Sequence, residues 1–240
     1  MNWYLKASNQ GSSLAKKNLE RMQSTGKNIR LSVTKPTTIL ASQSDTTAFV
    51  NLGRMYYKGE EVQQDYAKAA EWFQKAANRG NTDALLLLGN LYDKGIGVPQ
   101  NYAKAIQMYE KAADQGDLDA QWLLAGKYYY GDGVRKDYVK AAELVQSPAN
   151  KGHANSQYIL GLMNFYGQGV PQDYAKAAEW YRKAANQGDI KAKGLLGIMY
   201  ANGIGVPQNR TKAAEWYRKA ANQGDKEAIE LLKQLESKGY

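Results

Sequence analysis

The chain has 240 residues, of which 43% are hydrophobic and 23% are charged, and these proportions allow one large domain or two small ones. It contains no cysteine and one histidine, which excludes disulfides and thiol catalysis and leaves no zinc site without help from several carboxylates. The net charge is +9, and residues 1–47 hold +5 of it (seven Lys or Arg against two Asp or Glu). This excess indicates a solvated surface or attraction to an acidic partner.

No membrane span is expected. The longest apolar run, residues 84–88, is far shorter than the roughly 20 residues that a membrane-spanning helix needs. The first six residues also lack the basic start and long apolar core of a signal peptide.

Residues 1–22 are predicted to be a partial repeat unit. The segment Trp3–Gly11 closely matches Trp180–Gly188, and Ala15, Leu19 and Met22 follow it with helical spacing. We therefore expect that the chain begins inside the second helix of an earlier unit, and that the natural protein extends further upstream or has been trimmed.

Residues 23–47 are predicted to be an irregular connection, because they are rich in Ser, Thr and Lys and include Pro36. A simple linker, a strand-like segment along the neighbouring helices and an arm ordered by a partner all remain open.

Residues 48–227 consist of five units with a period of 36 residues and no insertion. The units cover residues 48–83, 84–119, 120–155, 156–191 and 192–227. Their first residues are Ala48, Ala84, Ala120, Ser156 and Ala192. A period in this range indicates stacked supersecondary units.

Each unit is predicted to hold two helices. In the first helix the apolar residues recur with helical spacing, as in Ala84, Leu87, Leu88, Leu91 and Tyr92, and these positions are expected to form the core. A glycine-rich turn ends it. The second helices begin at residues that cap helices well, namely Asp65, Asn101, Asp137, Asp173 and Asn209.

The third unit departs from the pattern. Pro148 replaces an alanine in its second helix, and a proline there removes a helical hydrogen bond, so we predict an early end or a kink at Gln146–Ser147. His153 replaces a probable first-helix cap and is expected to be a surface histidine.

Residues 228–240 are predicted to form a C-terminal capping helix. One helix pair cannot bury its apolar face alone, so neighbouring pairs must stack. The sequence therefore predicts an all-α fold, a right-handed α-solenoid of helix-turn-helix units.

The unit pattern resembles that of Sel1-like repeats, which are related to tetratricopeptide repeats. The shared pattern runs from the Ala-x-x-x-Leu-Gly start through the Gly-x-Gly-Val turn to Asp-Tyr-x-Lys-Ala-x-x-Trp, and it covers at least three quarters of the chain. The resemblance implies a bacterial, non-catalytic adaptor that binds a partner protein on its concave face. It leaves open whether the compartment is periplasm, slightly favoured, or cytoplasm.

Partner binding is expected on the face of each first helix that stacking leaves free. Side chains at i, i+4 and i+7 share this face, and they differ between units while the packing positions do not. Aromatic residues, which often dominate interfaces, gather there in units three and four. The predicted partner-binding residues are Tyr57, Leu86, Asp93, Trp122, Tyr129, Tyr158, Leu162, Phe165 and Ile198. The alternative is that the aromatic side chains bury one another.

Two further functions are weighed against a general scaffold. The resemblance also implies a bacterial immunity protein that neutralises a secreted (type VI, phospholipase-type) toxin, which would present an acidic surface. RNA binding is disfavoured, because residues 84–119 carry three Lys against five Asp or Glu and so interrupt any basic stripe. No catalytic residue, cofactor or metal is expected, since the Gly-x-Gly sequences recur as turns and none continues as a phosphate-binding loop.

Overall fold

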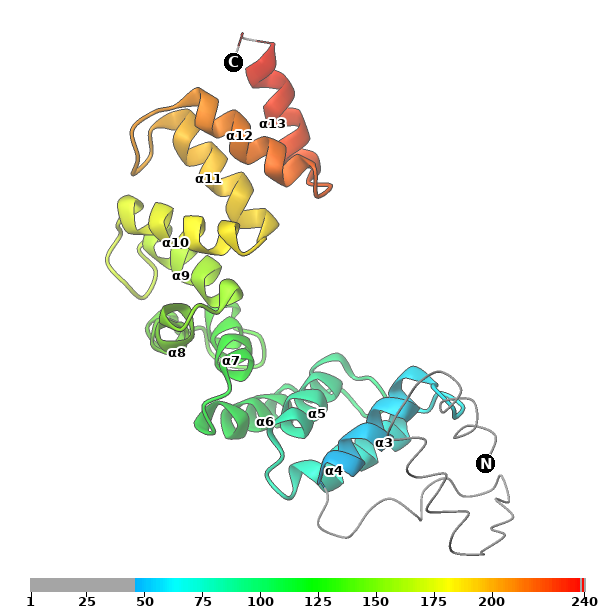
Figure 1. Ribbon diagram of the computed structural model, residues 1–240. Coiled ribbons are helices and arrows are strands. Elements are labelled where there is room, and N and C mark those ends of the chain that lie inside the picture. The colour runs from blue at the N-terminus through cyan, green and yellow to red at the C-terminus, as the bar shows by residue number, and fades with distance from the viewer. Residues whose placement is uncertain (1–45, 238, 240) are drawn as a thin grey trace, which may run out of the picture. The chain divides into compact units, whose positions relative to one another are not determined.

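The computed structural model describes residues 46–237 and residue 239. The predicted partial repeat (residues 1–22) and the predicted connection (23–47) lie outside the described residues, except that Thr46 and Thr47 begin a helix. Within residues 46–237 the chain forms eleven helices and no strand (Figure 1). They are α3 (Thr46–Lys58), α4 (Tyr66–Ala77), α5 (Thr82–Lys94), α6 (Tyr102–Asp114), α7 (Leu118–Tyr130), α8 (Tyr138–Asn150), α9 (Ala154–Tyr166), α10 (Tyr174–Asn186), α11 (Ile190–Asn202), α12 (Arg210–Ala221) and α13 (Lys226–Glu236).

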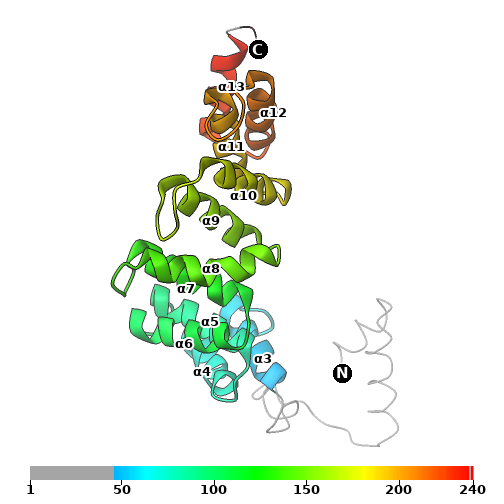
Figure 2. The same ribbon diagram turned by 90° about the vertical axis from the view of Figure 1, so that its left-hand side faces the viewer.

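The described helices form consecutive pairs. Each helix packs on the next one along the chain, so that α4 joins the α3–α4 pair to α5, and α12 joins the last pair to α13. Figure 2 shows the pairs following one another from α3 to α13. The buried residues form several clusters, and half-buried side chains such as Tyr128 and Tyr158 pack against two clusters each, so the apolar packing continues from one pair to the next.

Short polar side chains start the second helices, as predicted. Asp65, Asn101, Asp137, Asp173 and Asn209 each accept a hydrogen bond from the backbone N–H three residues later, at 2.8–3.0 Å. Such caps satisfy N–H groups that the first helical turn leaves unpaired, at about 1 kcal/mol each. The predicted caps are confirmed.

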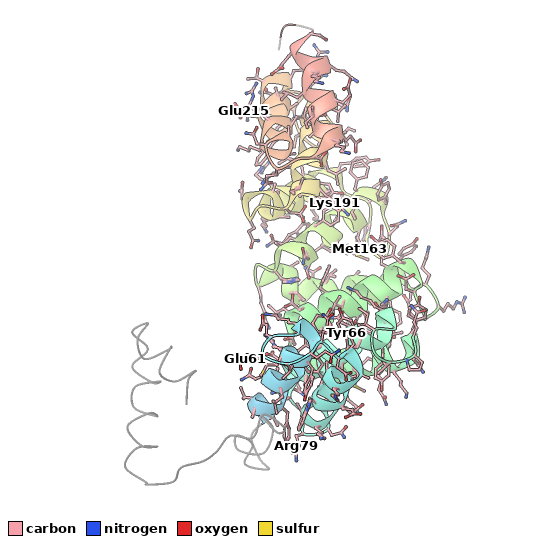
Figure 3. The ribbon with its side chains drawn as sticks, turned by 90° about the vertical axis from the view of Figure 1, so that its right-hand side faces the viewer. Glu61, Tyr66, Arg79, Met163, Lys191 and Glu215 are labelled. Atoms are coloured by element: carbon pink, nitrogen blue, oxygen red, sulfur yellow. The ribbon has the colours of Figure 1, made fainter. Side chains whose placement is uncertain are left out.

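The turn between the two helices of a pair contacts the preceding pair. A Cβ on Gly97 (φ +70°) would lie 2.3 Å from the backbone carbon of Tyr66, so only glycine fits. In α3–α4 the same turn position is Glu61, whose φ is +63° (labelled in Figure 3). Glu61 is exposed, and this turn retains a left-handed residue without glycine.

Inside four of the pairs, an aromatic ring of the second helix packs directly on a glycine of the first. A Cβ on these glycines would lie 2.4–2.6 Å from the ring. The glycine–ring pairs are Gly53–Phe73, Gly89–Tyr109, Gly161–Tyr181 and Gly197–Tyr217. In α7–α8 the corresponding residues are Ala125 and Val145, both buried, so a larger first-helix residue is matched by a smaller partner.

Most of the predicted core positions of the first helices are buried, as Ala84, Leu88 and Leu91 show. Leu87 is only half-buried, whereas the second position of the unit, which was not predicted, is buried at Leu85 and Gln157. The Gln157 amide donates to the carbonyl of Ala149, at the end of the preceding second helix. This position faces the previous pair, a contact that the periodicity of one helix cannot reveal.

The prediction for Pro148 is wrong. Helix α8 continues through Pro148 to Asn150, and the Pro148 side chain is fully buried. Pro148 removes the N–H that would bond to the carbonyl of Leu144, but only Ala149 and Asn150 follow it in the helix, so few further helical hydrogen bonds depend on this position. Its carbonyl still accepts a hydrogen bond from the His153 N–H at 2.9 Å.

Candidate protein-binding groove

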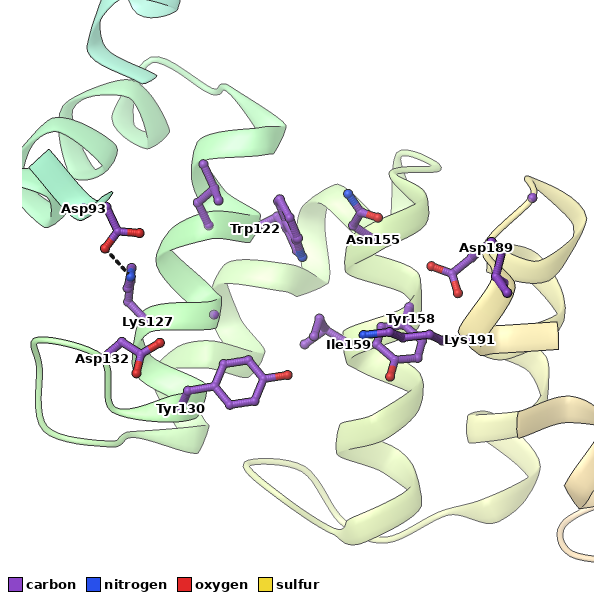
Figure 4. A pocket seen from close by; sticks show the side chains of 14 residues that line it. Asp93, Trp122, Lys127, Tyr130, Asp132, Asn155, Tyr158, Ile159, Asp189 and Lys191 are labelled. Carbon is purple, nitrogen blue, oxygen red and sulfur yellow. Dashed lines mark hydrogen bonds and ion pairs between the residues drawn. The ribbon is translucent and has the colours of Figure 1, made fainter. Parts of the chain in front are cut away.

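A hollow of about 590 Å³ lies between α7 and α9 and reaches the start of α11 (Figure 4). We call it the groove. Its lining residues are Asp93, Trp122, Leu123, Gly126, Lys127, Tyr130, Asp132, Asn155, Tyr158, Ile159, Gly188, Asp189, Ile190 and Lys191.

The groove owes its depth to Gly126 on α7. A Cβ built on Gly126 meets no heavy atom within 4 Å, so this glycine faces open space. The other first helices carry a side chain at the same place, namely Arg54, Asn90, Leu162 and Ile198. At this position the glycine leaves room for a side chain of a bound partner.

Three aromatic side chains line the groove. Trp122 comes from the first half of α7, Tyr130 from its last residue and Tyr158 from α9 (Figure 4). Tyr130 is 57% exposed, whereas Tyr158 is half-buried. Burial, and to a lesser extent the nearby Tyr130 and Asp189, raise the pKa of Tyr158 to about 12. Tyr158 therefore stays a neutral hydroxyl, able to donate and accept hydrogen bonds, across the physiological pH range.

The charged residues of the groove carry both signs. Asp93 of α5 forms an ion pair with Lys127 of α7, and both side chains are largely covered, at 18% and 11% exposed. Asp189 caps α11 by accepting a hydrogen bond from the Ala192 N–H. Asp132, in the turn after Tyr130, and Lys191, in the first turn of α11, also line the groove (Figure 4). A ligand would therefore find an aromatic centre with polar groups at its sides.

His153 supports the groove from beside Trp122 and caps α9. Its Nδ1 accepts a hydrogen bond from the Ser156 N–H at 3.3 Å, and its Nε2 lies 2.9 Å from an Asp119 carboxylate oxygen. The imidazole and Trp122 rings are 6.0 Å apart. The side chain is only 16% exposed, so His153 is mostly covered and is not the surface histidine expected.

The structure separates the predicted partner-binding residues into two groups. Asp93, Trp122 and Tyr158 line the groove, and Ile198 lines a smaller neighbouring hollow of about 400 Å³ together with Tyr158. The others contact neighbouring side chains of the protein itself, although Tyr57 is still 38% exposed. Leu86 and Leu162 are half-buried against core clusters, and Tyr57, Tyr129 and Phe165 pack edge-on against Tyr66, Tyr138 and Tyr174 at 5.1–5.2 Å.

Sequence reasoning missed several lining residues. Tyr130 ends α7, Asp132 lies in the turn after it, and Lys191 lies in the first turn of α11. None of them belongs to the i, i+4, i+7 face on which the prediction depended. The available signal was Gly126, the only glycine at its place among the five repeated first helices.

Comparison with known proteins identifies the repeat. The Sel1 repeat model matches residues 1–12, 50–81, 82–117, 118–153, 154–189 and 191–225. The chain belongs to the Sel1 repeat family. The predicted all-α solenoid of Sel1-like repeats is thereby confirmed. A search of curated proteins gave no match.

Solved Sel1 repeat structures resemble the chain over most of its length. The crystal structure of c5321, a protective antigen present in uropathogenic Escherichia coli strains, is 34% identical with a TM-score of 0.81. The match covers 99% of this chain but 52% of c5321, so this chain spans about half of that antigen. A Sel1 repeat protein from Oxalobacter formigenes is 31% identical with a TM-score of 0.75, covering 79% of this chain and 76% of that one.

An immunity protein from Pseudomonas aeruginosa is more distant. It is 23% identical with a TM-score of 0.51, covering 74% of this chain and 67% of that one, and this likeness concerns the fold alone. Sel1 repeat proteins are generally non-catalytic scaffolds for protein interactions. Within the described part of the chain, no helix is long and apolar enough to cross a membrane. Among the same residues, no three His, Asp or Glu side chains are grouped to hold a metal ion.

Proposed function

We propose that this protein is a non-catalytic scaffold that binds a partner protein in the groove between α7 and α9. The observation that carries the proposal is the gathering of Trp122, Tyr130 and Tyr158 around the open space above Gly126. These residues stand where the units differ, whereas the capping and core positions recur from unit to unit. Residues that the repeat does not need for stacking are available for recognition.

The size and chemistry of the groove suit one or two side chains of a protein partner. A volume of about 590 Å³ is in the range of small binding pockets and is far too small for a folded domain. Trp and Tyr are the side chains that most often dominate the binding energy of protein interfaces. We therefore expect the partner to insert an apolar or aromatic side chain, with polar neighbours that meet Asp132 and Lys191 at the sides.

The test fills the groove without disturbing the fold. Gly126→Gln adds a helix-compatible side chain at a place where a Cβ meets nothing within 4 Å. Ala103→Gln adds the same side chain at an exposed position of α6 and serves as the matched control. Circular dichroism spectra and melting curves of both variants should match those of the wild type.

Affinity capture from the source organism, quantified by mass spectrometry, then measures binding. At least one protein should be captured by the wild type and by Ala103→Gln, and should be reduced about tenfold or more by Gly126→Gln, as expected for loss of a buried anchor. Trp122→Ala should lower the capture of the same protein. Equal recovery of every captured protein with all variants would contradict a partner in this groove.

A narrower proposal is that the partner is a secreted toxin, so that the protein acts in immunity. It is supported by the resemblance to Sel1-like immunity proteins, whereas the likeness to the Pseudomonas aeruginosa protein adds only the fold. A toxin partner should form a tight 1:1 complex and lose its activity on addition of this protein, and Gly126→Gln should restore that activity. Several weak partners, none of them inhibited, would instead favour a general scaffold.

A further inference from the structure

The turn between α7 and α8 differs from the corresponding turns of the other units. Residues 98–100, 170–172 and 206–208 all read Val-Pro-Gln, whereas residues 134–136 read Val-Arg-Lys. The difference puts two cations, Arg135 and Lys136, on a single turn. Since the five units share one backbone plan, the neighbouring turns show what this turn needs for folding alone.

The glutamine of the ordinary turn has a structural role that Lys136 does not take over. Its side-chain amide donates a hydrogen bond, at 2.8–2.9 Å, to a carbonyl at the end of the preceding first helix. These bonds are Gln64 to Tyr57, Gln100 to Asp93, Gln172 to Phe165 and Gln208 to Ala201. Among the described residues, no such bond joins Lys136 to α7. The third unit thus lacks a hydrogen bond worth about 1 kcal/mol, and Lys136 does not stabilise the turn in the way that the glutamine does in the other units.

The residues that replace the ordinary turn line a separate hollow of about 710 Å³. We call it the basic site. Its lining residues are Tyr128, Val134, Arg135, Lys136, Asp137, Tyr138, Val139, Lys140 and Gly169, and none of them lines the groove. Three cations therefore face one carboxylate, and that carboxylate, Asp137, is engaged in capping α8 through the Lys140 N–H.

Two of the three cations of the basic site form no ion pair within the described part of the chain, whereas the third, Lys140, is also attracted by the Glu110 and Asp137 carboxylates. Arg135 and Lys136 are exposed and form no ion pair there, and Lys136 lies over the Tyr138 ring, 5.6 Å from its centre. The Lys140 ammonium donates to the Tyr128 hydroxyl at 2.6 Å. Next to them Val139 is 58% exposed, at a place where the other second helices have Ala or Thr. The surface combines unpaired positive charge with an exposed apolar side chain.

We propose that the basic site binds an acidic segment of a partner protein, with carboxylates on Arg135 and Lys136 and an apolar side chain on Val139. The positive charge is complementary to carboxylates, and Arg in particular binds them through two parallel hydrogen bonds. The two extra cations, Arg135 and Lys136, are confined to one turn, because the neighbouring turns carry Pro99-Gln100 and Pro171-Gln172, whereas a lysine at the place of Lys140 recurs in every unit. A nucleic acid backbone would instead be followed by cations over several turns. The basic site is thus a second interaction surface, independent of the groove.

The test restores the ordinary turn. The double variant Arg135→Pro, Lys136→Gln copies a sequence that three other turns of the same protein already carry, so it should fold and regain the missing hydrogen bond. Lys111→Gln with Lys151→Gln removes the same two charges from exposed positions that do not line the basic site, and is the matched control. The probes are a fluorescein-labelled peptide of repeated Glu-Glu-Leu and the same peptide with Gln for Glu, followed by fluorescence anisotropy at physiological salt.

The wild type and the control should bind the acidic peptide, and the double variant with the restored turn should bind it at least tenfold more weakly. The Gln peptide should bind at least tenfold more weakly to the wild type. Gly126→Gln should keep full affinity, so that failure of the basic site and failure of the groove are distinguished. No binding of the acidic peptide, or equal affinity of the restored turn, would overturn the proposal. Preferential, turn-dependent binding of a single-stranded oligonucleotide would assign the basic site to nucleic acid instead.

Discussion

Substituting Gly161 with alanine tests the packing on which each helix pair depends. The added Cβ would lie 2.6 Å from two ring carbons of Tyr181, a residue that is 1% exposed and has no room to withdraw. Overpacking a tight core costs about 1–3 kcal/mol, and a contact this close belongs at the upper end. Alanine regains about 1 kcal/mol of helix propensity over glycine. We expect Gly161→Ala to lower the free energy of unfolding by about 2 kcal/mol.

Gly194→Ala is the matched control, because a Cβ there meets nothing within 4 Å. It should raise the free energy of unfolding by about 1 kcal/mol, so that the two variants differ by about 3 kcal/mol. Urea denaturation followed by circular dichroism measures both, provided that the m-values agree. The double variant Gly161→Ala, Tyr181→Val copies the Ala125–Val145 pair and should lose less than the sum of its single variants. If Gly161→Ala stabilised the protein as Gly194→Ala does, the proposed glycine–ring packing would be refuted.

Three further predictions concern polar groups of the described residues. The Tyr109 hydroxyl donates to Asn90 at 2.9 Å, whereas the buried Tyr181 hydroxyl has no hydrogen-bond partner among the described residues. Tyr109→Phe should therefore lower the free energy of unfolding by about 1 kcal/mol, and Tyr181→Phe should leave it unchanged. Equal losses for the two variants in urea denaturation would contradict this assignment. Burial raises the pKa of Tyr158 to about 12, above the usual value near 10. As the pH rises, the unfolded chain therefore loses this proton before the folded protein does, so the stabilisation by neutral Tyr158 is complete below about pH 10 and is lost as the pH rises through 12. A difference titration at 295 nm between wild type and Tyr158→Phe should show a phenol that ionises near pH 12. Ionisation near pH 10 would be evidence against this shift. His153→Ala should cost about 1 kcal/mol by removing the cap of α9 while His153→Asn keeps it, and equal melting temperatures for the two variants would show that the cap contributes nothing.

The repeat architecture followed from the sequence because it depends on local chemistry that recurs. Cap residues such as Asp65 and Asp173 satisfy the N–H groups of their own helix, so their position marks its start wherever the helix packs. The 36-residue period then requires equivalent pairs to stack, since no pair buries its apolar face alone. Helix type, order and the all-α solenoid could therefore be derived before any coordinates.

The candidate site depended on contacts between pairs, which local patterns do not contain. Tyr129 shares a helical face with Trp122, and Phe165 is its equivalent in the next unit, yet each packs on a tyrosine of its own pair, while Trp122 remains available to the groove. Lys191 joins Trp122 only because the start of α11 lines the same hollow as α7 and α9. Gly126 appears in the sequence as a weak helix residue, and it becomes the open floor of the groove once two neighbouring pairs are in place. Periodicity determines which way a side chain points, but only the packed neighbours decide whether it meets protein or open space.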